Sequence, residues 1–132
     1  QGSLWGDWLE HCDLVTVSPK PPSSGMSDRL DVPLLQKYAV RLRERLVAKV
    51  VIFDKADLEF AERISRILPT TRLYLSAGTP PMFSGEGREI SRRLACESYS
   101  WLCEAVLERP SLHRAVLGMQ MHVLAWGREL GR

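Results

Sequence analysis

The side chains best suited to bind a small molecule lie in three short segments of the chain. Ser18-Pro19-Lys20 ends an apolar run and offers a hydroxyl and an ammonium group, which can meet an anion such as a carboxylate. Neighbouring prolines stiffen this loop and lower the cost of ordering it around a ligand. Ser76-Ala77-Gly78-Thr79 follows a second apolar run, and Gln120 and His122 lie in a third. A stiff surface loop and a hydrogen-bonded core histidine are the structural alternatives to these ligand-binding roles.

Alternating strands and helices are predicted to position these segments. Apolar, β-branched runs predict strands at 13–18, 47–53 and 72–77, and a last extended segment at 118–127. Helical spacing of apolar residues predicts helices at 32–46, 58–68 and 86–108, the first two capped by Asp31 and Asp57. Pro110 is expected to open a short helical turn that runs to Leu117. Strand alternation would turn Gln120 and His122 to the same face.

The predicted order is β-α-β-α-β-α-β, which implies right-handed crossovers and an α/β fold with mostly parallel strands. Ligands of such sheets bind at the carboxyl ends of the strands. Ser18–Lys20, Asp54 and Ser76–Thr79 are therefore expected on the same side of the sheet. Four strands are few for an independent domain of this class. The sheet edges are thus expected to need further strands or a partner.

The composition limits the possible classes of function. The 132 residues predict one domain, and their 18 basic and 16 acidic side chains give a net charge of +2. This balance offers no electrostatic argument for binding nucleic acid or a membrane surface. No apolar run approaches the roughly 18 residues that span a bilayer. Because the first residue is Gln1 rather than Met, we expect it to lie inside a longer native chain.

Neither a catalytic residue nor a metal ligand is predicted from the motifs. Cys12, Cys96 and Cys103 are too widely spaced for a zinc knuckle or an iron–sulfur loop, and their odd number suggests a reducing compartment. We expect them to be buried structural thiols. Asp54 and Asp57 have no third metal ligand nearby. Lys49, at the start of an apolar strand, either points into the mouth of the sheet or extends to water.

Several stretches carry more information than their composition. The most specific is Thr16–Met26, with its run Ser-Pro-Lys-Pro-Pro-Ser-Ser. The others, in chain order, are Gln1–Trp5 with Asp7-Trp8, Lys49–Ala61, Tyr74-Leu75 and Gln120–Gly127. Together they resemble the 7-carboxy-7-deazaguanine synthase family of radical S-adenosylmethionine (SAM) enzymes, over essentially the whole chain.

The resemblance implies the C-terminal half of a distorted, incomplete (β/α) radical SAM barrel, with residues 1–132 as the C-terminal part of one core domain. It implies a carbon–nitrogen lyase of queuosine biosynthesis, which converts 6-carboxy-5,6,7,8-tetrahydropterin to 7-carboxy-7-deazaguanine with loss of ammonia. The implied cofactors are SAM, a [4Fe–4S] cluster and Mg²⁺. The implied protein is a cytoplasmic homodimer that binds a pterin substrate, and neither nucleic acid nor a membrane.

The resemblance also assigns residues by position. Ser18, Pro19 and Lys20 correspond to one SAM-binding loop of the family. Ser76, Ala77, Gly78 and Thr79 correspond to a second SAM-binding loop. Gln120, His122 and Arg132 are the expected substrate-binding residues.

The chain also departs from the family pattern. The family's cysteine triad, its Mg²⁺-binding Thr or Ser and its glycine-rich strand ends are absent. Roughly the N-terminal half is therefore expected to be missing, and this chain alone is expected to be inactive. Ser76-Ala77-Gly78 stands where close relatives have Gln-Val-Gly. Two alternatives stay open: a non-catalytic α/β module that binds a small molecule, and a radical SAM homologue with a different substrate.

Overall fold

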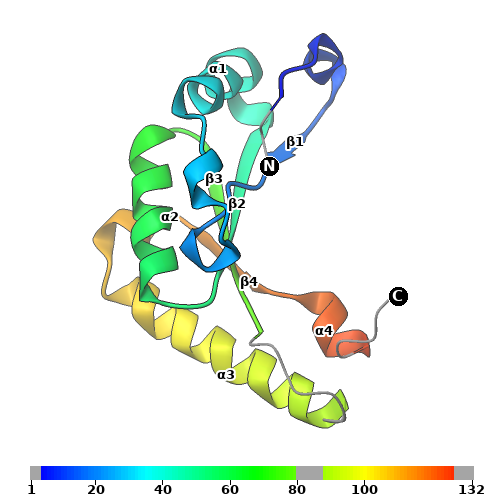
Figure 1. Ribbon diagram of the computed structural model, residues 1–132, viewed down its shortest axis with the longest axis vertical. Coiled ribbons are helices and arrows are strands. Elements are labelled where there is room, and N and C mark those ends of the chain that lie inside the picture. The colour runs from blue at the N-terminus through cyan, green and yellow to red at the C-terminus, as the bar shows by residue number, and fades with distance from the viewer. Residues whose placement is uncertain (1–3, 80–87, 127–132) are drawn as a thin grey trace.

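The computed structural model describes residues 4–79 and 88–126. They form an open sheet of four parallel strands, β1 (Val15–Val17), β2 (Leu46–Ile52), β3 (Arg72–Ala77) and β4 (Val116–Met119). The strands lie side by side in chain order (Figure 1). The predicted α/β class and the parallel strands are confirmed, and the sheet is not closed, as expected for part of a barrel.

Helices connect consecutive strands. α1 (Val32–Leu42) links β1 to β2, α2 (Lys55–Ile67) links β2 to β3, and α3 (Arg88–Leu107) lies between β3 and β4. α4 (Met121–Trp126) follows β4. In Figure 1, α1 and α2 stand to the left of the sheet and α3 runs below them. No helix in the described ranges is long and apolar enough to cross a membrane.

One face of the sheet forms the hydrophobic core. Side chains alternate along a strand, so Val50 of β2 and its register partner Leu75 of β3 point to the same face, and both are fully buried. They belong to one apolar cluster with Leu42 of α1, Leu58 of α2 and Leu102 of α3. Burial of this face against three helices supplies the main favourable free energy of folding.

The opposite face of the sheet carries polar and charged side chains together with three valines. The register places Lys49 of β2 beside Tyr74 of β3, and Lys49 is exposed. We call this the open face. Its side chains are those of Thr16, Val47, Lys49, Val51, Arg72, Tyr74, Ser76 and Val116. Because parallel sheets are usually covered on both faces, the open face is available to a ligand or to further polypeptide.

Two helix boundaries differ from the prediction. α1 ends at Leu42 instead of residue 46, because Arg43 adopts a φ of 52° and begins a separate 3-10 turn. α2 is capped by Asp54, whose carboxylate accepts a hydrogen bond from the N–H of Asp57 at 3.0 Å. Asp57 is therefore not the N-cap, and the prediction for it is wrong. The structure gives Asp57 a different role, described below.

The predicted extended segment 118–127 is also wrong. Only Val116–Met119 forms a strand, because the carbonyl of Gln120 accepts hydrogen bonds from Val123 and Leu124 and thereby starts α4. A short apolar run does not distinguish strand from helix by periodicity, and here the helix buries Val123. Gln120 and His122 therefore do not share a strand face. The turn at Pro110 is shorter than expected and ends at Leu112.

The expectation of buried cysteines is wrong for Cys96. All three thiols are free; Cys96 is exposed, while Cys12 and Cys103 are half-buried. α3 packs on the core through Leu102 and Val106, so Cys96 falls on the outer side of the helix.

Leu75→Ala tests the core. Leu75 is fully buried on an inner strand, so loss of its side chain leaves a cavity and should lower the free energy of unfolding by about 2–5 kcal/mol. Urea denaturation followed by circular dichroism measures the change. Leu107→Ala removes the same side chain from a position that is 74% exposed and should change the free energy by less than about 0.5 kcal/mol. Equal losses in the two variants would contradict the assignment of the core.

Candidate functional site

A cavity of about 220 Å³ lies at the carboxyl ends of β1 and β2. Its walls come from the loop after β1, the end of β2 and the residue after β4. The lining residues are Ser18, Pro19, Lys20, Pro21, Ser23, Ser24, Val51, Phe53 and Gln120. Two of the segments predicted to bind ligand, Ser18–Lys20 and Gln120, therefore meet at one cavity although they lie at opposite ends of the chain.

The loop after β1 is held by its own hydrogen bonds. The carbonyl of Pro21 accepts from the Ser24 hydroxyl at 2.6 Å and from the Ser24 N–H at 3.0 Å. Gly25 ends the turn at a φ of 66°, which glycine adopts without strain. Pro19 and Pro21 are buried, whereas Lys20 between them is half-buried. The prolines thus anchor the loop and leave Lys20 at the cavity wall.

Asp57 joins two walls of the cavity. Its side chain is completely buried. One carboxylate oxygen accepts the N–H of Ser23 at 3.0 Å, and the other accepts the N–H of Phe53 at 2.9 Å. Ser23 belongs to the loop after β1 and Phe53 to the end of β2, so one carboxylate fixes both. The sequence signal for this role was the pair Asp54-x-x-Asp57, of which only one residue can be the cap.

The turn after β3 contacts two of the residues that line the cavity, Phe53 and Gln120. The N–H of Gly78 donates to the carbonyl of Ile52 at 2.8 Å, and a Cβ at residue 78 would lie only 2.6 Å from the Phe53 ring. Glycine therefore allows the ring, which lines the cavity, to pack against this turn. The N–H of Thr79 donates to Gln120 Oε1 at 3.2 Å. Residues 76–79 are buried and do not line the cavity themselves.

Ser76 has a buried hydroxyl beside the cavity floor. The residue is 3% exposed, and its Oγ makes no hydrogen bond within the described part of the chain. Ser76 is level with Val51 in the sheet, and Val51 lines the cavity. A buried hydroxyl without a partner costs about 1–3 kcal/mol. A ligand group that reached this position would remove that cost.

Other predicted residues either do not line the cavity or lie outside the described part of the chain. His122 is exposed on α4 and does not line it. Asp54 is exposed and caps α2. Arg132 lies outside the described residues.

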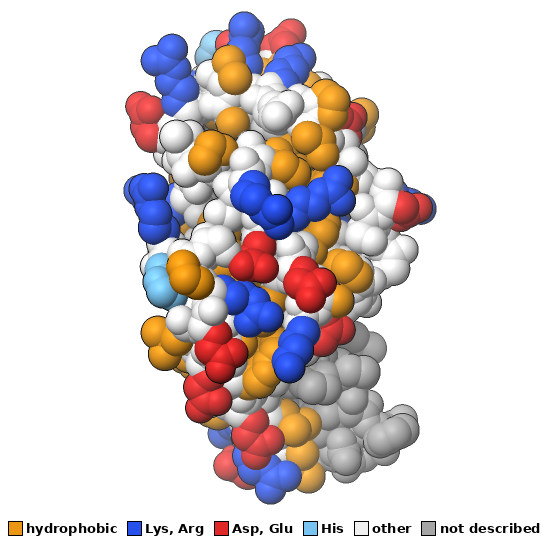
Figure 2. Space-filling model, turned by 90° about the vertical axis from the view of Figure 1, so that its left-hand side faces the viewer, with side chains coloured by type: hydrophobic (Ala, Val, Ile, Leu, Met, Phe, Trp, Pro, Cys, Tyr) orange, Lys and Arg blue, Asp and Glu red, His pale blue; other side chains and the backbone are white. Residues whose placement is uncertain are grey.

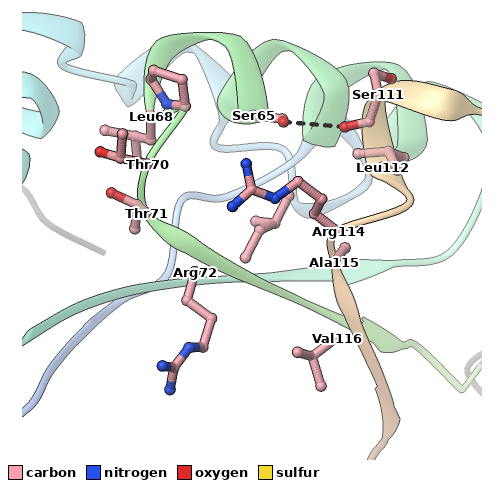
Figure 3. Close-up of a pocket in the computed structure, with 12 residues that line it drawn as sticks. Ser65, Leu68, Thr70, Thr71, Arg72, Ser111, Leu112, Arg114, Ala115 and Val116 are labelled. Atoms are coloured by element: carbon pink, nitrogen blue, oxygen red, sulfur yellow. Dashed lines mark hydrogen bonds between the residues drawn. The ribbon is translucent and has the colours of Figure 1, made fainter. Parts of the chain in front are cut away.

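A second cavity, of about 390 Å³, lies at the opposite, amino ends of β3 and β4 (Figure 3). Thr70, Thr71 and Arg114 line it, and the Ser65 hydroxyl donates to the Ser111 carbonyl at 3.2 Å on its wall. None of the residues that the sequence predicted to bind ligand lies there. Size alone therefore does not identify the functional site.

The surface over the helices has mixed charge. Figure 2 shows Lys and Arg side chains interspersed with Asp and Glu on the side that lies to the left in Figure 1. Arg109 Nε and Glu62 Oε2, for example, form an ion pair at 4.0 Å. This side therefore presents no patch of a single sign, in agreement with the small net charge of the chain.

The cysteines do not gather into a site for an iron–sulfur cluster. Cys12 precedes β1, whereas Cys96 and Cys103 lie on α3. Within residues 4–79 and 88–126, no group of three or more His, Cys, Asp or Glu side chains could hold a metal ion. The described donor set therefore does not fit a [4Fe–4S] cluster.

Comparison with known proteins bears on the resemblance. No family model matches the chain. Over 134 residues it is 34% identical to the 7-carboxy-7-deazaguanine synthase of Bacillus cereus and 31% identical to that of Bacillus subtilis. These matches cover 99% of this chain but 54% and 55% of the two relatives. The chain thus spans about half the length of the curated relatives it matches, and the resemblance noted in the sequence is confirmed.

Asp57→Ala tests the joint between the cavity walls. Two partly buried N–H groups would lose a charged acceptor, so the free energy of unfolding should fall by about 2–3 kcal/mol. Amide hydrogen exchange at Ser23 and Phe53 should become faster, because both N–H groups donate to this carboxylate.

Asp31→Ala is the matched control. Asp31 caps α1 by accepting one bond, from the Leu34 N–H at 2.9 Å. Its loss should cost about 1 kcal/mol and leave exchange at Ser23 and Phe53 unchanged. Slow exchange at Ser23 and Phe53 in Asp57→Ala would show that the carboxylate does not hold the cavity walls.

Proposed function

We propose that this chain is part of a 7-carboxy-7-deazaguanine synthase and that the cavity beside Ser18–Lys20 is its SAM-binding site. Two observations support the proposal. The relatives that carry this name match the chain over 99% of its length. Ser18, Lys20 and Gln120, which correspond to the family's binding motifs, line one cavity at the carboxyl ends of parallel strands. The second observation carries the proposal, because the motifs meet in space only through the fold.

The residues around the cavity suit the cofactor. SAM has a positively charged sulfonium, a carboxylate, hydroxyls and an adenine ring, so its site needs both polar and apolar groups. The Lys20 ammonium would bind the anionic group, and the Ser18 hydroxyl would hydrogen-bond a polar one. Val51 and Phe53 offer the apolar surface. In the reaction of the family, SAM supplies the radical chemistry, while these residues bind and orient it.

Gln120 would act on the ligand through one half of its amide. Its Oε1 already accepts the N–H of Thr79, which fixes the orientation of the group. The side-chain NH₂ remains to donate to a ligand in the cavity. His122 and Arg132 are proposed as substrate contacts from the resemblance alone. The proposed substrate is 6-carboxy-5,6,7,8-tetrahydropterin, which would lose ammonia in a carbon–nitrogen lyase reaction.

The [4Fe–4S] cluster and Mg²⁺ would be held outside this chain. The described residues do not fit them, and the curated relatives are nearly twice as long as the span matched here. A cytoplasmic homodimer is proposed for the whole protein by resemblance, and the three free thiols suit a reducing compartment.

A ligand-binding module without catalysis is the second candidate. The observation in its favour is the absence of a cluster-binding group among the described residues. The complete reading frame separates the two candidates: a cysteine triad upstream of Gln1 is expected for the synthase, and its absence there would leave the binding module.

Lys20→Ala tests the SAM site. Loss of a charge-assisted hydrogen bond should weaken SAM binding to the chain about 10-fold, as measured by equilibrium dialysis. Lys55→Ala is the control, since Lys55 is exposed on α2 and does not line the cavity. Unchanged SAM affinity in Lys20→Ala would reduce Ser18-Pro19-Lys20 to a stiff surface loop.

A further inference from the structure

Lys49 is a charged residue in the middle of an apolar strand. It is flanked in β2 only by Leu, Val, Ala and Ile residues. Its side chain is exposed on the open face of the sheet, and no described residue forms an ion pair or hydrogen bond with it. A lysine at the start of a strand extends easily to water, but Lys49 lies three residues from either end of β2.

The register brings Lys49 close to the cavity at the strand ends. Val51, two residues further along β2, lies on the same face roughly 7 Å away and lines the cavity. Val17 of β1 pairs with Ala48 of β2. Continuing this register by one residue puts Ser18, which also lines the cavity, beside Lys49. The flexible four-carbon stem of Lys49 would allow its ammonium to reach a ligand that extends from the cavity over the open face.

Two hydroxyl groups flank the same position. Tyr74 on β3 is the register partner of Lys49 and is half-buried. Ser76, the next residue of β3 on this face, has the buried Oγ that lacks a hydrogen-bond partner among the described residues. An ammonium and two hydroxyls can all donate hydrogen bonds to one acceptor group. The unpartnered Ser76 is the observation that distinguishes this place from an ordinary solvated surface.

The charge on the open face selects the kind of ligand. Lys49 and Arg72 are its ionised side chains, and the strands contribute no Asp or Glu to it. Arg72 is level with Val47 and lies farther from the cavity than Lys49 does. With two positive charges and no counter-charge on the strands, the face favours an anion. A carboxylate suits these three neighbouring donors because its two oxygens accept several hydrogen bonds.

We propose that Lys49, together with Tyr74 and Ser76, is a carboxylate-binding subsite on the open face of the sheet, next to the cavity. The proposal rests on the proposed function and deepens it, because it names residues that would recognise the acid group of the bound small molecule. One carboxylate in that function is on the methionine part of SAM, where Lys49 would act beside Lys20. Another is on the pterin substrate, and the product 7-carboxy-7-deazaguanine also has one. All present the same chemistry to Lys49.

The test measures the affinity of the chain for four ligands by titration calorimetry. They are SAM, decarboxylated SAM, 7-carboxy-7-deazaguanine and 7-deazaguanine, which form two pairs that differ by a carboxylate. Lys49→Met keeps most of the length of the side chain and removes its charge. It should weaken binding of a carboxylated ligand about 10- to 100-fold and leave its carboxylate-free counterpart unchanged. The pair that shows the difference identifies the source of the carboxylate.

Arg63→Met and Ser76→Ala complete the experiment. Arg63→Met removes one positive charge from an exposed position on α2 and should leave all four affinities unchanged. Ser76→Ala removes only the unpartnered hydroxyl, should not destabilise the fold, and should weaken the same carboxylated ligand several-fold. It provides the test if Lys49→Met does not fold.

The outcomes separate this inference from the proposed function. Equal affinities in Lys49→Met and the unaltered chain, or equal losses for both members of a pair, would overturn the subsite and leave the proposed function standing. Failure of the unaltered chain to bind either carboxylated ligand would overturn the proposed function, and the subsite with it.

Discussion

The buried carboxylate of Asp57 is the constraint on which the candidate site depends. Burial of a charge costs several kcal/mol unless hydrogen bonds compensate it, and here two backbone N–H groups do so. Because those N–H groups belong to Ser23 and Phe53, the loop after β1 and the end of β2 are fixed to each other. The Phe53 ring packs against Gly78, and Thr79 binds Gln120. One chain of contacts therefore connects the carboxyl ends of all four strands.

The two faces of the sheet have different tasks. The face covered by α1, α2 and α3 is apolar and stabilises the fold. The open face carries Lys49 and the Ser76 hydroxyl, which has no hydrogen-bond partner among the described residues. Such a hydroxyl is costly for stability but suits a ligand. A parallel sheet is usually covered on both faces. In the proposed enzyme, the open face would be covered by the segment of the protein that this chain does not span.

Much of the fold followed from the sequence because its signals are local. Continuous apolar strands and amphipathic helices predicted the order of elements, and the position of Ser18–Lys20 after a strand predicted its place at the sheet edge. The errors arose where two local signals compete. Asp54 and Asp57 are both suitable N-cap residues for α2. The apolar pattern of residues 118–127 is compatible with a strand and with a helix. The role of Asp57 and the buried hydroxyl of Ser76 depend on partners distant in sequence, which periodicity does not reveal.

The ligand site is placed at the carboxyl ends of the strands, in the 220 Å³ cavity and not in the larger one at the amino ends of β3 and β4. Titration of the isotopically labelled chain with SAM, followed by two-dimensional NMR, tests it most directly. We expect the amide signals of Ser18, Lys20 and Gln120 to shift together with those of Ser76–Thr79. Shifts confined to Thr70–Arg72 and Arg114–Val116, at the other cavity, would contradict it, as would a titration that leaves every amide signal unchanged.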